Sequence, residues 1–167
     1  VKFNTVENGI SIRSANSDSA LVGTLGGINV SETPDTSVLG VTQIAAVKTF
    51  ASADGTYENG WKWIFDVTVP ANETHLKMKF ADWVSGSNNI AAANNMRFYS
   101  AQSSNAANAG SAITITAANA YSDSLTLNAD LDANKLGRQI QVTVEVKVPA
   151  GSAGGSYSTS YGIQSTQ

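Results

Sequence analysis

The sequence contains no cysteine among its 167 residues. This absence excludes disulfide bonds, a thiol nucleophile and any zinc site built from thiolates. It does not by itself indicate a cellular compartment. The sequence also contains no apolar run of about 18 residues, which is the length that a membrane-spanning helix needs. No transmembrane segment is therefore predicted.

Charge is scarce as well. Asp, Glu, Lys and Arg make up 14% of the residues, against about 25% in an average soluble domain. The formal net charge is -3, and the Lys and Arg residues are dispersed along the chain. Because the neutralisation of phosphates requires a cationic surface, we do not expect nucleic acid to be a partner.

Residues that carry catalysis are few. His75 is the single histidine, and no Gly-x-Ser-x-Gly sequence accompanies it, so a Ser-His-Asp triad is not predicted. We interpret His75 as a solvent-facing residue at the start of a strand, with a general base or a metal ligand as the alternative. A pair of carboxylates assembled in space is not excluded by sequence. We nevertheless expect no enzyme and assign no catalytic residue.

What the sequence has instead is an alternation of apolar and polar residues with a period of two. Residues 140–148 and 61–69 both alternate in this way and are followed by Pro149 and Pro70, and a third alternating segment covers residues 76–80. This period indicates half-buried strands, and proline ends a strand because it cannot donate to the ladder. The short link between the second and third segments leaves open whether they lie in one sheet or in facing sheets.

Shorter strands are predicted between these three, with Gly, Asn, Asp and Ser in the connections. This pattern favours a single all-β domain over residues 1–167, folded as a two-sheet antiparallel sandwich with Greek-key or jelly-roll connections. Helix is limited to a turn or two around residues 103–109. The shorter strands are expected at residues 1–6, 9–13, 21–30, 40–50, 96–101, 112–116, 125–127 and 157–163.

The segment 148–157 reads Val-Pro-Ala-Gly-Ser-Ala-Gly-Gly-Ser-Tyr. Here Pro149 closes a strand, and the glycines permit positive φ in the turn that follows. The segment resembles the last hairpin of Ig-like and jelly-roll sandwich modules of secreted prokaryotic surface proteins. The resemblance implies a sandwich fold and a secreted or cell-surface location. It also implies a final strand in which Tyr157, Thr159, Tyr161 and Ile163 face the core.

Oxygen-bearing side chains alternate near the C-terminal third of the chain, at Asn128, Asp130, Asp132 and Asn134. Such a set suits calcium, a hard cation that takes six to eight oxygen ligands. An EF-hand would require glycine where Lys135 stands, so the segment is not one. The expected arrangement is a polar turn whose side chains bind their own backbone, and a calcium site built from sandwich loops is the candidate functional interpretation.

Tryptophan provides the second candidate site. Trp83 follows a predicted strand, in a loop that also contains Asp82, Asn88 and Asn89. An exposed indole beside carboxylate and amide groups offers a flat apolar face for a sugar ring and polar partners for its hydroxyls. The expected arrangement is that Trp83 plugs the end of the sandwich and its indole N–H binds a loop carbonyl. A glycan-binding site formed by these four residues is the candidate functional interpretation.

The N-terminal residues 1–6 alternate and suggest a third role. Such a segment can complete the sheet of a neighbouring molecule as a donor or edge strand, or it can be the first strand of its own sandwich. The prediction is therefore a non-enzymatic module, secreted or on the cell surface, acting in adhesion or as a structural subunit of a surface layer or filament. A carbohydrate-binding module is the alternative. The expected partners are further copies of the chain or a surface glycan, and calcium is the one candidate cofactor.

Overall fold

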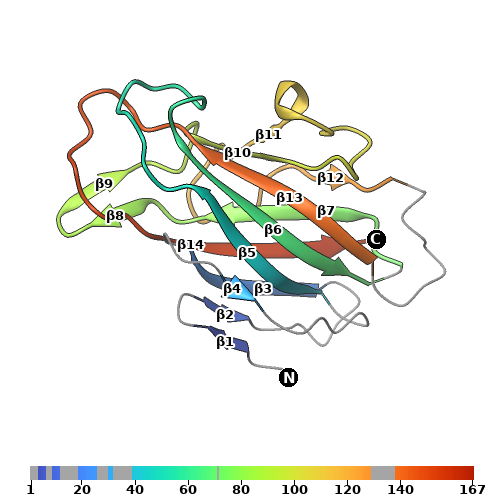
Figure 1. The fold of residues 1–167 in the computed structure, drawn as a ribbon. Helices are drawn as coiled ribbons and strands as arrows, with labels where there is room; N and C mark the ends of the chain where they lie inside the picture. The colour runs from blue at the N-terminus through green and yellow to red at the C-terminus, as the bar shows by residue number, and fades with distance from the viewer. Residues whose placement is uncertain are drawn as a thin grey trace.

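The computed structural model describes residues 4–6, 9–11, 19–25, 30–31, 39–70, 72–128 and 138–167. Two antiparallel sheets face each other across an apolar core (Figure 1). The predicted all-β sandwich is therefore confirmed. The larger sheet has the strand order β11 (Ile113–Thr114), β10 (Met96–Tyr99), β13 (Arg138–Val146), β6 (Trp61–Val69), β5 (Gly40–Lys48) and β4 (Val30–Ser31). The smaller sheet has the order β12 (Leu125–Thr126), β7 (His75–Phe80), β14 (Thr159–Thr166) and β3 (Ser19–Leu25).

Two further strand pairs and a short helix complete the described structure: β1 (Asn4–Val6) with β2 (Gly9–Ser11), β8 (Trp83–Ser85) with β9 (Asn88–Ile90), and the 3-10 helix η1 (Ala109–Ser111). The β8–β9 hairpin is absent from the strand predictions. It turns at Gly86, whose φ is 60°. Glycine adopts this φ without a Cβ clash, and a two-residue turn of this form follows the twist of the strands.

The alternation of β6 and β13 has the predicted cause. Phe65 and Val67 of β6 and Val142 and Val144 of β13 are completely buried, while their neighbours along each strand lie on the outer face of the sheet. The two strands pair along their whole length, so their apolar faces form one continuous surface. Burial of each such side chain contributes about 1.5–3 kcal/mol.

The opposite wall of the core comes from β7 and β14. Met78 of β7 and Ile163 of β14 are completely buried, and Tyr161 of β14 is nearly so. The ring of Phe65 meets the ring of Tyr161 at a centroid distance of 5.2 Å and an interplanar angle of 88°. This edge-to-face contact is worth about 0.5–1.5 kcal/mol beyond the area it buries. It joins the two sheets directly.

The connections cross between sheets more often than the sequence indicated. Strands β6 and β7 lie in facing sheets, which decides between the two arrangements that the sequence left open. Strands β13 and β14 also lie in different sheets, so the hairpin predicted for residues 148–157 is wrong. Strand β14 pairs with β3 and β7 instead. The single strand predicted for residues 21–30 is likewise wrong, because β3 and β4 belong to opposite sheets.

At Gly60, the loop that precedes β6 passes very close to the backbone of β13, and a substitution tests this close approach. A Cβ at this position would lie 1.8 Å from the carbonyl oxygen of Val146. Because backbone must move to make room, we expect Gly60→Ala to lower the free energy of unfolding by roughly 1–3 kcal/mol in urea denaturation. Gly154→Ala is the control, since its Cβ would meet nothing within 4 Å. Equal stability of the two variants would contradict the close approach.

Candidate functional site

Three connections gather at one end of the sandwich: the loop 49–60 between β5 and β6, the loop 147–158 between β13 and β14, and the β8–β9 hairpin (Figure 1). The amide of Gly55 donates to the carbonyl of Val148 at 2.8 Å, which joins the two loops. Val84 and Ser158 exchange backbone hydrogen bonds of 2.9 and 3.1 Å, which join the hairpin to the second loop. The three connections therefore form one linked surface.

The loop 49–60 is held by its own polar side chains. The Asp54 carboxylate accepts hydrogen bonds from the Asn59 side-chain amide at 2.7 Å and from the Thr56 hydroxyl and amide at 2.8 and 3.0 Å. These bonds, that of Asn59 first, hold the pKa of Asp54 below its ordinary value. The carboxylate is therefore charged at neutral pH and acts as the centre of the turn.

Tyr57 fastens this loop to the outer face of the larger sheet. The guanidinium of Arg97 lies 3.9 Å from the centroid of the Tyr57 ring, and the ammonium of Lys147 lies 5.4 Å from it. Both are cation–π contacts. Burial raises the pKa of the Tyr57 phenol above its ordinary value, with the Arg97 charge acting against the shift and the Glu145 charge adding to it. The ring therefore stays neutral at physiological pH.

Arg97 is itself fixed by Glu145, a carboxylate of β13 that is only 7% exposed. The Nε and Nη2 atoms of Arg97 both lie 2.7 Å from Oε2 of Glu145. The Tyr99 hydroxyl donates to Oε1 at 3.1 Å, and the Lys62 ammonium lies 3.5 Å from the same oxygen. A buried carboxylate needs such partners, because its desolvation is otherwise uncompensated.

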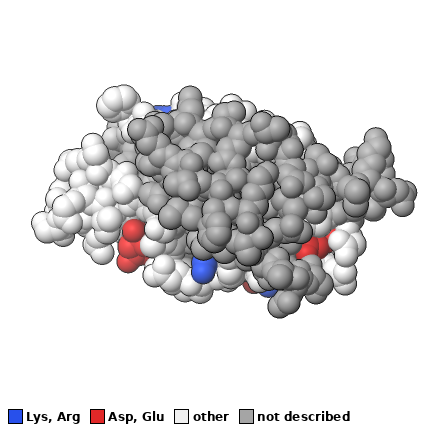
Figure 2. Space-filling view, turned by 90° about the horizontal axis from the view of Figure 1, so that it is seen from below, with Lys and Arg blue, Asp and Glu red and all other residues white. Residues whose placement is uncertain are grey.

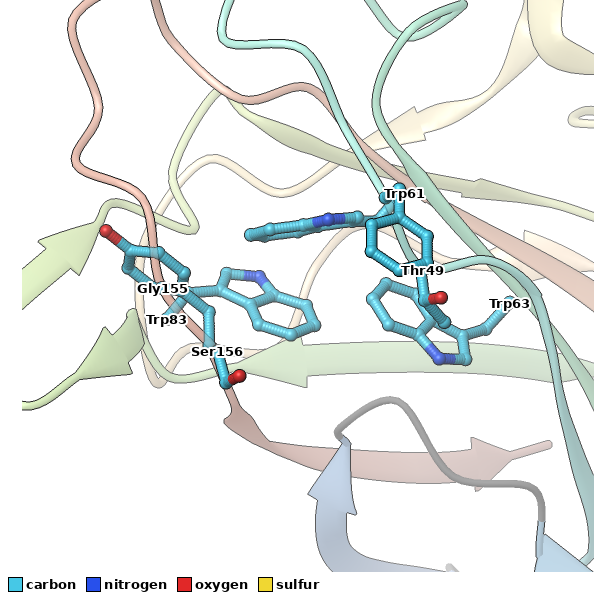
Figure 3. Close-up of a pocket in the computed structure, with 8 residues that line it drawn as sticks. Thr49, Trp61, Trp63, Trp83, Gly155 and Ser156 are labelled. Atoms are coloured by element: carbon cyan, nitrogen blue, oxygen red, sulfur yellow. The ribbon is translucent and has the colours of Figure 1, made fainter.

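On the inner side of this end, four aromatic rings pack together. Trp63 and Trp83 stack at a centroid distance of 5.1 Å and an angle of 19°. Trp61 lies 5.2 Å from Trp83 and 5.7 Å from Tyr157 (Figure 3). Strands β6 and β8 and the loop 147–158 contribute these rings, which we call the aromatic cluster: Trp61, Trp63, Trp83 and Tyr157. The cluster closes this end of the core.

A hollow of about 280 Å³ opens beside the aromatic cluster, and we call it the end pocket. Phe50 stands at this pocket with 87% of its surface exposed, whereas Trp61 is 9% exposed. Leaving a phenylalanine in water rather than burying it forgoes about 1.5–3 kcal/mol. Exposed apolar surface beside a hollow is typical of a binding site. The pocket is lined by Thr49, Phe50, Gly155, Ser156 and the four residues of the aromatic cluster.

The predicted glycan site is only partly assembled. Trp83 is completely buried, and its indole N–H donates to the sulfur of Met96 at 3.2 Å. The burial expected of a Trp83 plug is therefore observed, with the Met96 sulfur as acceptor instead of a loop carbonyl, and the exposed platform of the glycan hypothesis is wrong, because Trp83 begins strand β8 and faces inward. The ring still contributes to the wall of the end pocket.

The polar residues predicted beside Trp83 lie elsewhere. The Asp82 carboxylate accepts a hydrogen bond of 2.9 Å from the amide of Ala92 and so holds a turn. Asn88 and Asn89 are exposed on β9, and neither lines the end pocket. A role in ligand binding stays a prediction for these three residues. None of the three lines the end pocket.

The calcium prediction falls mostly outside the described residues. Asp130, Asp132 and Asn134 lie there, and Asn128 alone is described; its side-chain amide donates to the carbonyl of Ala101 at 3.3 Å. Within the described ranges, no three acidic or histidine side chains gather as a metal site. His75 stands at the start of β7, with Nδ1 3.0 Å from the Thr74 hydroxyl oxygen. Calcium binding stays a prediction.

Self-assembly also stays a prediction. Residues 4–6 of the N-terminal segment pair with β2 of the same chain, and residues 1–3 lie outside the described structure. One edge of the smaller sheet is covered: the amides of Asn119 and Ser122 donate to β7 carbonyls at 2.8 and 3.0 Å. Covering an edge in this way blocks strand addition there. The described charged side chains visible in Figure 2 are few and scattered.

Sequence reasoning missed Phe50. It was included in a strand over residues 40–50, but β5 ends at Lys48 and Phe50 lies in the following loop. The available signal was similar to the one that drew attention to Trp83, namely an aromatic residue at or just after the end of a predicted strand, beside a loop of small and polar residues. Phe50 is the only aromatic side chain classed as exposed within the described part of the chain.

Comparison with known proteins adds no family. Neither a scan against protein-family models nor searches of curated proteins and solved structures finds a match for this chain. In the described residues, helical structure has neither the length nor the apolar character needed to span a bilayer. The end pocket is therefore the feature of this chain that bears on its function.

The Glu145 network supports the loop at this pocket, and a double-mutant cycle tests it. Arg97→Met leaves Glu145 with weaker partners, and we expect a loss of about 1–3 kcal/mol in the free energy of unfolding. Replacing both residues by methionine also removes the Glu145 charge, which Arg97→Met leaves without its main partner. The double variant should therefore be more stable than Arg97→Met alone. Chemical denaturation measures both. A double variant that is less stable than the single one would refute the coupling.

Proposed function

We propose that this chain is a non-enzymatic, secreted or cell-surface module that acts in adhesion by binding carbohydrate in the end pocket. The observation that carries the proposal is Phe50, an 87% exposed aromatic ring standing beside a hollow walled by tryptophans. Aromatic faces bind the apolar C–H face of a sugar ring, and they do so without a charged partner. The proposal joins the adhesion and carbohydrate hypotheses in one site.

The polar groups at the pocket suit sugar hydroxyls. Thr49 and Ser156 line it, and neither side-chain hydroxyl is engaged in a hydrogen bond within the described part of the chain (Figure 3). Each hydroxyl can both donate and accept, as a sugar hydroxyl does. A few such groups among aromatic walls are typical of small-ligand sites, in which the polar groups fix orientation.

The rigidity of the pocket also supports binding. Trp61, Trp63 and Trp83 are held by one another and by the core, so their rings are already in place before a ligand arrives. The loop that carries Phe50 is fastened at Tyr57 by its contact with Arg97. A preformed wall limits the ordering entropy that binding must overcome.

The proposal does not extend to catalysis. The lining offers aromatic rings and hydroxyl groups, and no Asp, Glu or His belongs to the described lining residues. A general acid–base pair of the kind that glycoside hydrolysis uses is therefore not found among the described lining residues.

Phe50→Ala tests the proposal. We expect a glycan array to identify a saccharide that binds the wild-type chain, and calorimetry to find about tenfold weaker binding by Phe50→Ala, because loss of a stacked ring removes on the order of 1.4 kcal/mol. Val84→Ala is the matched control: Val84 is also an exposed apolar residue, 50% exposed, but it does not line the pocket.

Two results would overturn the proposal. One is a wild-type chain that binds no saccharide on the array. The other is equal binding by Phe50→Ala and Val84→Ala, which would place the glycan elsewhere on the molecule.

A further inference from the structure

A second hollow adjoins the end pocket and has a volume of about 190 Å³. Its own wall lies on the outer parts of the same two loops and includes Ala53, Ser152 and Ala153. Five residues line both hollows: Thr49, Phe50, Trp61, Gly155 and Tyr157. Because they share these walls, the two hollows are neighbouring parts of one site.

The volumes limit what each hollow can hold. Sites for drug-sized ligands measure about 300–1,000 Å³, and the hollows measure about 280 and 190 Å³. Each alone falls below that range, and together they come within it. One hollow therefore suits one small ring, and the pair suits two linked rings. Phe50 and Tyr157, which belong to both walls, would contact both rings.

The polar groups of both hollows are uncharged. Ser156 serves the first hollow and Ser152 the second, and the Tyr157 hydroxyl donates to the carbonyl of Ala153 at 2.7 Å. Within the described structure, neither lining includes Asp, Glu, Lys, Arg or His. A carboxylate or sulfate on the ligand would lose hydration here without gaining a counter-ion, which is costly.

Trp61 supplies a third observation. It lines both hollows and is only 9% exposed, yet its indole N–H has no hydrogen-bond acceptor in the described part of the chain. A donor at the wall of a hollow that has no protein partner is available to a ligand. A hydroxyl oxygen of a bound sugar would accept this hydrogen bond.

We propose that the site consists of two adjoining subsites for an uncharged disaccharide, or for two consecutive units of a longer neutral polysaccharide. This inference rests on the proposed carbohydrate binding and specifies its substrate class. The larger subsite, beside Ser156 and over the buried rings of Trp63 and Trp83, holds one unit. The smaller, against Ala53 and Ala153, holds the next.

Calorimetry with matched sugars tests the number of subsites. The probes are cellobiose, chitobiose, lactose and mannobiose, each against the methyl glycosides of its units. We expect at least one neutral disaccharide to bind the wild-type chain about tenfold or more tightly than its methyl glycosides do. We expect methyl glucuronide to bind at least about tenfold more weakly than methyl glucoside, because no Lys or Arg belongs to the described lining to receive its carboxylate.

Blocking variants separate the two subsites. Ala53→Phe and Ala153→Phe each fill the smaller hollow from its rim, so we expect disaccharide affinity to fall to the level of the monosaccharide while monosaccharide affinity is unchanged. Ser156→Phe blocks the larger hollow, and we expect it to abolish binding of both. Circular dichroism and thermal melting of each variant, compared with the wild type, establish that it is folded. Two independent blocks of the smaller hollow guard against failure of one.

The outcomes distinguish this inference from the proposed function. If the wild-type chain binds a disaccharide and its methyl glycosides within about threefold, or if both smaller-hollow variants weaken the two equally, a single subsite remains and the inference is overturned alone. If a charged sugar binds more tightly than its neutral counterpart, the uncharged character is refuted. If no saccharide binds, both proposals fall.

Discussion

The inner face of β6 is the constraint on which the rest of the molecule depends. At its middle, Phe65 packs edge-to-face against Tyr161 and holds the two sheets together. The same alternation continues toward the start of the strand and places Trp63 and Trp61 at the end of the sandwich. One row of side chains on β6 therefore contributes to both the core and the candidate site. The period of two that buries Phe65 also delivers the tryptophans to the pocket.

The loops at that end turn this row into a site. Without them, Trp61 and Trp63 would simply cap the core. The loop 49–60 brings Phe50 to the rim, and its fastening through Tyr57 and Arg97 uses the outer face of the same sheet. One strand pair, β6 with β13, therefore supports the pocket from both faces: apolar packing inside and the Glu145 charge network outside. We therefore expect a substitution on either face of this strand pair to alter the position of the loop that carries Phe50.

The fold was predictable where local pattern decides structure. The strands β6, β7 and β13 follow from their alternation, and proline marks where β6 ends, because each of these features acts within a few residues. The crossing of the segment 147–158 between sheets was not predictable in this way. The crossing depends on the strands with which β14 pairs. These are β3 and β7, which lie far from β14 in the sequence, so a local pattern does not specify the pairing. The site divides similarly. Trp61 and Trp63 follow the alternation of residues 61–69 and could be placed on its buried face, but the exposure of Phe50 and the burial of Trp83 depend on how loops fold over the end.

The central claim, that this aromatic end binds a saccharide, has a direct reporter in the protein itself. The chain contains three tryptophans, and all three line the end pocket. The indole N–H signals in nuclear magnetic resonance spectra therefore all come from this pocket. They can be followed while a saccharide that binds the chain is titrated into the sample. We expect the Trp61 indole signal to shift in parallel with the saturation of saccharide binding. Saturable binding measured by calorimetry with all three indole signals unchanged would contradict it.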